Sequence, residues 1–353
     1  MASRKEEIIQ RATAEQQQKF SLASFKKKKG FTAESAKYKE QSWIPLSKAW
    51  QTAVGLPGVP QGHITLFRGH SDTGKTTAML ECAAGCQKIG VLPVFIITEV
   101  KFDWKFAKSI GVEFEEVVDP ETGEVTGYDG FFLYNDRSNL NTIEDVASYI
   151  ADLLDEQAKG KLPYDLCFLW DSVGSVPCKM SVESKSNSNM WNAGALSQQF
   201  GNYLDQKIVL SRKQSSPWTN TLVCINKIWN VVENAFTGQV GIRNKGGEAL
   251  YYDCSLCVNY GNPANAGTAK LKLIADKKEY TWGKTTNISV EKCHLSAMCN
   301  KGKVIMTPTG FINVEEAEKY KAAHKSEWIN KLGTANYQEV VEEEDLDSGM
   351  YVE

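Results

Sequence analysis

Long apolar segments are missing from this sequence of 353 residues. No apolar run reaches the ~18 residues that are needed to span a bilayer. The first residues, MASRKEEIIQ, contain no apolar segment of the kind found in a signal peptide, and the chain has no internal repeat. The hydrophobic share of 42% and the charged share of 24% are ordinary for a soluble globular protein. We therefore expect a cytoplasmic protein without a membrane partner, built as one large domain with small additions.

A regular cysteine pattern is missing as well. The nine cysteines are odd in number and irregular in spacing, which indicates reduced thiols rather than a disulfide framework. Cys254 and Cys257 form a C-x-x-C, so half of a metal site is one interpretation of this pair. They lie in the aromatic, apolar segment YYDCSLCVNY, which favours a strand, and residues three apart on a strand point to opposite faces. We expect buried thiols here.

Charge is distributed unevenly, although the net charge is only −3. Residues 1–40 carry ten Lys and Arg against five Asp and Glu, and residues 337–353 carry seven acids and no base. A basic arm with an acidic tail is typical of proteins that bind nucleic acid and restrain that binding. From the charges alone, solvated, flexible termini are the favoured interpretation.

Strand-like and helix-like segments alternate along the chain, which predicts an α/β fold with a mostly parallel central sheet flanked by helices. The expected helices lie at residues 76–89, 105–110, 143–159 and 190–214. The expected strands lie at residues 62–69, 91–99, 162–172, 221–226, 249–260, 269–276 and 287–295.

One motif between an expected strand and helix points to phosphate chemistry, because it fits G-x-x-x-x-G-K-[ST] in full. Its glycines let backbone N–H groups converge on phosphates, and the helix N-terminus adds a favourable dipole. Lys75 should reach the β- and γ-phosphates of ATP, and the Thr76 hydroxyl should bind Mg²⁺. The predicted nucleotide-binding residues here are Gly69, His70, Ser71, Asp72, Thr73, Gly74, Lys75, Thr76 and Thr77.

Two acids complete the predicted site. Asp171 ends the apolar run LCFLWD, where a P-loop protein needs a second group to organise Mg²⁺; a helix cap is the alternative interpretation. Glu99 ends the run VFIITE that follows the P-loop helix, at the strand ends where open α/β sheets bind their ligands. We predict that Glu99 orients or deprotonates the attacking water, with a surface acid as the alternative.

At these motifs the chain resembles the RecA family of recombinases. Residues 46–77 resemble the family's segment around the phosphate loop, and FIITEVKFDWKFAKSIGV, LWDSVGSV, CINKIWN and KGGEALYYDCSLCV resemble later segments in the same order. The resemblance covers roughly residues 44–312, and its divergence is more like that of phage-encoded recombinases of the UvsX type than of a bacterial RecA, with a bacterial origin left open.

The resemblance implies roles for individual residues. Glu99 falls on the family's catalytic glutamate, Asp103 on its adenine-contacting aspartate and Phe106 on the aromatic residue that stacks on adenine. Lys227 stands where the family has a glutamine that senses the γ-phosphate; a lysine can contact that phosphate but cannot accept a hydrogen bond. Lys292 is nearest to the lysines that reach across the filament interface to a neighbour's ATP.

The resemblance also implies two DNA-binding loops, at about residues 181–190 and 229–247, for which disorder without DNA is expected. In such loops apolar side chains enter between bases, while cations and backbone N–H groups hold phosphates. The candidate DNA-binding residues are Met190, Arg243, Lys245, Gly246 and Gly247.

The resemblance therefore predicts an ATP-dependent recombinase that forms a filament on single-stranded DNA, pairs it with duplex DNA, and works with single-strand-binding and mediator proteins in a bacterial cell. We expect an N-terminal helix and basic linker for polymerisation at 1–42, a RecA-like ATPase core at 43–312, and a C-terminal helix with a disordered acidic tail at 313–353. A hexameric helicase motor and a regulatory ATPase acting on proteins are the alternatives; 40 polar residues are too few for a helicase's N-terminal domain, and the basic, glycine-rich second loop disfavours the regulator.

Overall fold

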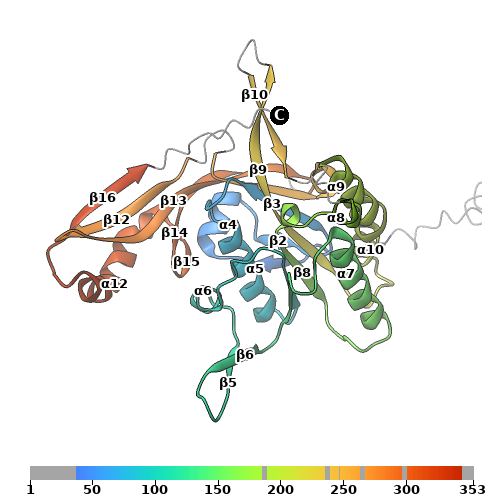
Figure 1. Ribbon diagram of the computed structural model, residues 1–353, viewed down its shortest axis with the longest axis horizontal. Helices are drawn as coiled ribbons and strands as arrows, with labels where there is room; N and C mark the ends of the chain where they lie inside the picture. The colour runs from blue at the N-terminus through green and yellow to red at the C-terminus, as the bar shows by residue number, and fades with distance from the viewer. Residues whose placement is uncertain are drawn as a thin grey trace, which may run out of the picture.

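The computed structural model describes residues 37–184, 189–234, 239–245, 247–262, 267–295 and 300–343. The expected N-terminal helix and most of the basic arm lie outside these residues. Within them the chain forms the expected α/β fold, with helices on both faces of a large sheet (Figure 1). No helix of the described residues is long and apolar enough to cross a membrane.

Six neighbouring strands form the parallel centre of the sheet, in the order β11-β3-β9-β8-β4-β7. Their carboxyl ends therefore meet along one edge, where ligands of open α/β sheets bind. The six strands are β3 (Ile64–Gly69), β4 (Leu92–Ile97), β7 (Leu133–Asp136), β8 (Leu166–Asp171), β9 (Thr221–Asn234) and β11 (Leu256–Tyr260).

Alternate residues of the central strands enter two separate cores, as the two-residue period of a strand requires. Phe67, Phe95 and Leu169 pack under one helical layer, whereas Leu66 and Phe168 pack under the other. The first layer contains α4 (Lys48–Val54), α5 (Lys75–Lys88) and α6 (Trp104–Ile110). The second contains α7 (Ile143–Ala158), α9 (Asn189–Leu196), the π-helix Ser197–Leu204, α10 (Asp205–Leu210) and α11 (Ala249–Asp253).

An antiparallel extension continues the sheet beyond β11 and forms a third core. Leu273, Trp282 and Ile305 pack there against Trp328 and Leu332 of the C-terminal helix. Figure 1 shows this extension reaching away from the parallel centre, with α12 beneath it. Its elements are β12 (Ala269–Ala275), β13 (Lys278–Cys293), β14 (Lys301–Thr307), β15 (Gly310–Asn313), α12 (Ala317–Leu332) and β16 (Gln338–Glu343).

Two further strand pairs lie outside the central path. The strands β5 (Glu115–Val118) and β6 (Val125–Asp129) form a two-stranded sheet of mostly exposed residues, and β1 (Trp43–Pro45) pairs with β2 (Gly58–Pro60). The long strand β9 continues past the sheet and pairs with β10 (Gln239–Asn244), so that the β9–β10 hairpin projects from the core (Figure 1).

The structure corrects four local expectations. Residues 249–253 form a helix rather than the first part of a strand, so Cys254 precedes β11 and both Cys254 and Cys257 enter the same core. The expected second loop is a β-hairpin over most of its described length. The expected first loop begins inside α8 (Lys179–Glu183) and ends inside α9. The first part of the acidic tail is strand β16, which pairs with β12.

Both cysteines of the C-x-x-C are buried, as expected, and all eight cysteines among the described residues are free. Among the described residues, the thiols of Cys82 and Cys86 on helix α5 and of Cys167 on strand β8 lie close to one another. All three are fully buried in the apolar core under α5, which is the environment of inert structural thiols.

Candidate nucleotide site

The phosphate motif forms a tight loop between β3 and α5. Gly74 precedes the helix with a left-handed backbone (φ 103°), and a Cβ atom there would lie 2.5 Å from the Met306 sulfur. Glycine is therefore required at this position by both conformation and space. The loop leads directly into the N-terminus of α5, and the free backbone N–H groups and dipole of a helix N-terminus favour bound phosphate.

Lys75 is buried in this loop, with 5% of its surface exposed. Its ammonium group donates to the backbone carbonyl of His70. Burial penalises the charged form and lowers the pKa of Lys75 from 10.5 to about 8. An anion bound beside this lysine would offset that penalty, so the buried cation suits the loop to an anionic ligand.

Thr76 and Asp171 meet at the carboxyl ends of the strands. The Thr76 hydroxyl donates to the Asp171 carboxylate over 2.8 Å. Burial raises the pKa of Asp171 to about 6. Hydroxyl and carboxylate oxygens are the ligands that Mg²⁺ prefers, so the two residues that the sequence assigned to Mg²⁺ fit such an ion together.

Glu99 lies two residues beyond the end of β4, close to the same point. The Ser172 hydroxyl donates to the Glu99 carboxylate over 2.5 Å, and the Lys227 ammonium lies 3.0 Å from it. Burial by itself would raise the pKa of Glu99, but these hydrogen bonds and the positive charge of Lys227 outweigh it and lower the pKa. Glu99 is thus held as a carboxylate, the form that can accept a proton from water.

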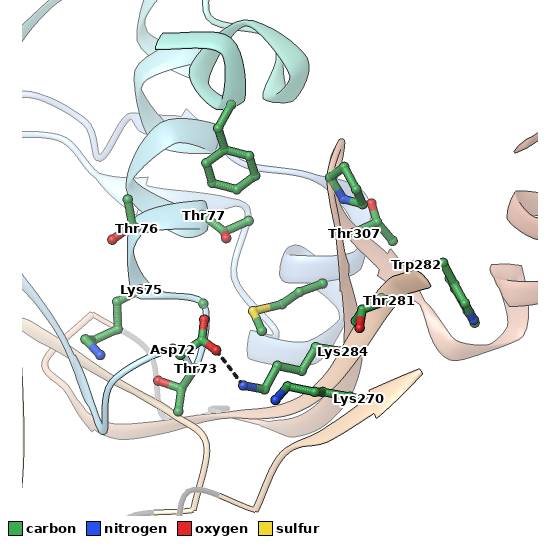
Figure 2. Close-up of a pocket in the computed structure, with 15 residues that line it drawn as sticks. Asp72, Thr73, Lys75, Thr76, Thr77, Lys270, Thr281, Trp282, Lys284 and Thr307 are labelled. Carbon is green, nitrogen blue, oxygen red and sulfur yellow. Dashed lines mark hydrogen bonds and ion pairs between the residues drawn. The ribbon is translucent and has the colours of Figure 1, made fainter. Parts of the chain in front are cut away.

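A pocket of about 430 Å³ opens beside the loop, and Figure 2 shows its walls. Phosphate-loop residues and Phe106 form one wall, while strands β13 and β14 and Lys270 of β12 form the other. The pocket-lining residues are Asp72, Thr73, Gly74, Lys75, Thr76, Thr77, Phe106, Lys270, Thr281, Trp282, Gly283, Lys284, Met306, Thr307 and Pro308.

The residues expected to contact adenine lie on neighbouring positions of α6. Phe106 lines the pocket, which is compatible with stacking on a base. Asp103 is the N-cap of α6, where its carboxylate accepts from the backbone N–H groups of Lys105 and Phe106 at 2.8 and 3.2 Å. Asp103 does not line the pocket, so the structure brings only Phe106 to it.

Lys292 lies apart from the pocket, on β13. Its ammonium donates to the backbone carbonyls of Tyr251 and Tyr252 at 3.0 and 2.6 Å. Its predicted contact with a neighbouring chain's nucleotide stays a prediction.

The candidate DNA-binding residues are spread over two elements. Met190 is 79% exposed near the start of α9, and Arg243 is exposed on β10. Lys245 is half-buried, and a Cβ on Gly174 would lie 2.6 Å from its side chain. Gly246 lies outside the described residues, and Gly247 has a left-handed backbone (φ 110°).

The nucleotide site and the β9–β10 hairpin are joined by strand β9. Lys227 on β9 pairs with Gly69 of the phosphate loop in the sheet register. Its backbone carbonyl accepts a 2.9 Å hydrogen bond from the backbone N–H of Lys245, at the end of the hairpin. One residue therefore contacts Glu99 through its side chain and the hairpin through its backbone.

Comparison with known proteins finds similarity to RecA. The RecA N-terminal domain family matches residues 8–129. Part of this chain is similar to RecA. Over 78 residues it is 41% identical to Protein RecA of Francisella philomiragia and 40% identical to Protein RecA of Francisella tularensis subsp. novicida. Each match spans 22% of this chain and 22% of the relative, so the chain spans about a fifth of the length of these RecA proteins.

Sequence reasoning missed the far wall of the pocket and the partner of Glu99. Ser172 directly follows Asp171, so the strand-end argument could have found it. Lys284, Trp282 and Lys270 carry no motif and lie about 200 residues after the phosphate loop, so only the folded sheet brings them to it.

Nucleotide affinity should depend on pH through Lys75. Its pKa is about 8 in the free protein, and a bound phosphate would raise it, so binding takes up a proton above that pH. Affinity should therefore be constant just below pH 8 and fall as pH rises above it, by up to about tenfold per pH unit. Titrating a non-hydrolysable ATP analogue across this range measures the effect. A constant dissociation constant well above pH 8 would contradict it.

Proposed function

We propose that this protein is an ATP-dependent recombinase of the RecA class, which forms a filament on single-stranded DNA and pairs that strand with homologous duplex DNA. The observation that carries the proposal is the sharing of strand β9. Strand β9 carries Lys227 of the proposed triphosphate site and then continues into the projecting hairpin, on which Arg243 is exposed. An ATP-controlled DNA-binding protein needs both of these parts.

The chemistry proposed is hydrolysis of ATP to ADP and phosphate. Lys75 and the backbone N–H groups at the start of α5 hold the phosphates, and Thr76 with Asp171 holds Mg²⁺. Mg²⁺, when bound, neutralises charge on the phosphate oxygens. Glu99 accepts a proton from the attacking water, because its carboxylate is ionised and lies beside the phosphate loop. Phe106 stacks on the base, and Asp103, which caps the helix that carries Phe106, contacts the adenine.

Lys227 gives this site a connection between hydrolysis and DNA. Its ammonium pairs with Glu99 at 3.0 Å, and a γ-phosphate would compete for the same ammonium. A shift of Lys227 would move the end of the hairpin, because the Lys227 carbonyl accepts a hydrogen bond from the backbone N–H of Lys245. We infer that nucleotide state changes hairpin position through this lysine.

Assembly is proposed to use the parts outside the described core. Residues 1–42 would dock on the next protomer, the core at 43–312 would hold ATP and DNA, and residues 313–353 would carry the C-terminal helix and acidic tail. Lys292 would contact the neighbour's nucleotide. We propose the phage type, with the cytoplasm of a bacterial cell as the site of action and single-strand-binding and mediator proteins as partners.

The β9–β10 hairpin supplies a test of DNA binding. Replacing both Arg243 and Lys245 with alanine should weaken single-stranded DNA binding at physiological salt and leave nucleotide binding intact. Each lost phosphate contact should lower the slope of log K against log salt by about 0.7, so the pair should lower it by about 1.4. Fluorescence anisotropy of a labelled oligonucleotide over a salt series, with a non-hydrolysable ATP analogue present, measures the slope.

A matched control removes two exposed lysines from α12, Lys319 and Lys325, and should leave the slope near that of the unmodified protein. An unchanged slope in the Arg243 and Lys245 variant would mean that these residues do not contact DNA phosphate. If the unmodified protein fails to bind single-stranded DNA, the alternative of a RecA-like regulatory or motor ATPase without strand exchange replaces the recombinase.

A further inference from the structure

The pocket's far wall is an antiparallel ribbon formed by strands β12 and β13, and it reaches the phosphate loop through one ion pair. The Lys284 ammonium on β13 lies 2.8 Å from the Asp72 carboxylate in the loop. Figure 2 shows this contact between the two walls, with Lys270 beside Lys284. The pair joins segments 212 residues apart in the sequence.

The two partners differ in burial. The Lys284 side chain is 9% exposed, whereas the Asp72 side chain is 78% exposed. The packing of the ribbon therefore fixes the position of Lys284, and Lys284 in turn holds the exposed carboxylate of Asp72. Asp72 also has a left-handed backbone (φ 60°), a conformation that is disfavoured for residues other than glycine. An anchored cation at its carboxylate stabilises this conformation of the loop.

Lys270 adds positive charge at the same place. It is the cross-strand partner of Lys284 in the β12–β13 register, and both side chains line the pocket. Like charges directly opposite each other destabilise a sheet, so this pair is favoured where anionic groups lie near. Asp72 is one such group, and Glu342 of β16 is opposite Lys270 on its other side. The phosphates of a nucleotide in the pocket would be a further source of negative charge.

The ribbon itself is firmly packed. Trp282, two residues from Lys284, is 3% exposed and packs against Tyr320 and Trp328 of α12. Strand β14 pairs with β13 on its other edge, where Lys284 is opposite Met306. The position of Lys284 is thus set by the third core rather than by the phosphate loop.

We propose that the β12–β13 ribbon is the second wall of the nucleotide site within the same chain, and that Lys284 is a positioning residue which, by pairing with Asp72, holds the phosphate loop ready for a nucleoside triphosphate. This inference rests on the proposed ATPase function and assigns part of its substrate affinity to the C-terminal part of the chain.

The test is a double-mutant cycle on the full chain. Lys284→Met should weaken binding of a Mg²⁺-bound non-hydrolysable ATP analogue, and raise the KM for ATP, by about fivefold, as expected for a partly exposed ion pair. The kcat at saturating ATP should change by less than about twofold, because Lys284 acts on the loop before chemistry. Asp72→Asn should weaken binding similarly, and the double variant should be no weaker than either single one. Lys284→Arg, which keeps the charge, should restore most of the affinity.

Lys272→Met is the matched control. Lys272 lies on the same ribbon, is similarly buried and pairs with Glu279 and Glu342, but it does not line the pocket. It should leave the KM unchanged, with folding followed by thermal unfolding. If Lys284→Met does not fold, Asp72→Asn and Lys284→Arg carry the test. If the unmodified protein binds nucleotide normally but the Lys284 and Asp72 variants change the KM additively or not at all, the inference about this ion pair is overturned and the proposed function is not. A failure of the unmodified protein to bind nucleotide would overturn the proposed function as well.

Discussion

Replacing Lys75 with alanine should remove ATP hydrolysis almost completely, by on the order of 10²–10³-fold or more. Among the described residues that line the pocket, Lys75 is the cation buried within the phosphate loop itself. Lys270 and Lys284 lie on the opposite wall, and Lys284 is already paired with Asp72. Lys227 pairs with Glu99 and is proposed to contact the γ-phosphate alone, so no other described side chain takes the place of Lys75 at both the β- and γ-phosphates. Release of phosphate from ATP, measured at saturating ATP and Mg²⁺, reports the loss.

Lys88→Ala is the control for this variant, since Lys88 is exposed in the last turn of the same helix. It should hydrolyse ATP at nearly the normal rate. Loss of a buried phosphate contact predicts a decrease by orders of magnitude. If the Lys75 variant hydrolyses ATP within about twofold of the rate of the unmodified protein, this would falsify the assignment of the phosphate loop.

Glu99→Gln should slow hydrolysis by about 10²–10⁴-fold, the usual effect of removing a general base, and should keep nucleotide and DNA binding. Glutamine has nearly the same shape and can still accept from Ser172, but it cannot take a proton from water. It also removes the charge that pairs with Lys227, so that lysine becomes available to the γ-phosphate. Complexes with DNA and ATP should therefore last longer in this variant.

Single-turnover hydrolysis separates the chemical step from binding in this experiment. Glu156→Gln is the matched control, because Glu156 also pairs with two lysines but lies on the surface at the end of α7. An unchanged rate constant in the Glu99 variant would move the role of base to another residue.

The parallel centre of the fold could be predicted except for β7, whose residues LYND form no apolar run, because the signals of the other strands are local. Each buried strand is a short apolar run, and the phosphate motif fixes which strand and helix flank it. The positions of Asp171 and Glu99 followed from the same rule, since both come at or just after the carboxyl ends of adjacent strands. Their closeness to Thr76 and Lys227 is a consequence of strand order, which the sequence patterns left open.

The antiparallel extension could be predicted only in part. Strands at 269–276 and 287–295 and the C-terminal helix were expected, whereas β14, β15 and β16 were not, because their stability comes from pairing between distant segments. Strand β16 is half acidic and mostly exposed, and it is held by pairing with β12 and by the ion pairs of Lys272 with Glu342 and of Lys321 with Glu339. Helix α11 has a strand-like composition, but the fold buries Leu250 while leaving Tyr252 71% exposed. In both places tertiary contacts outweigh local preference.

Stimulation of ATP hydrolysis by single-stranded DNA is the property that an ATPase coupled to DNA binding must show. The steady-state rate is compared with and without a homopolymeric single strand, at saturating ATP and Mg²⁺, for the unmodified protein and for the Arg243→Ala, Lys245→Ala variant. We expect a higher rate with DNA in the unmodified protein, and little stimulation in the variant despite an intact phosphate loop. A rate that does not respond to single-stranded DNA in the unmodified protein would contradict the proposed link between the nucleotide site and the β9–β10 hairpin.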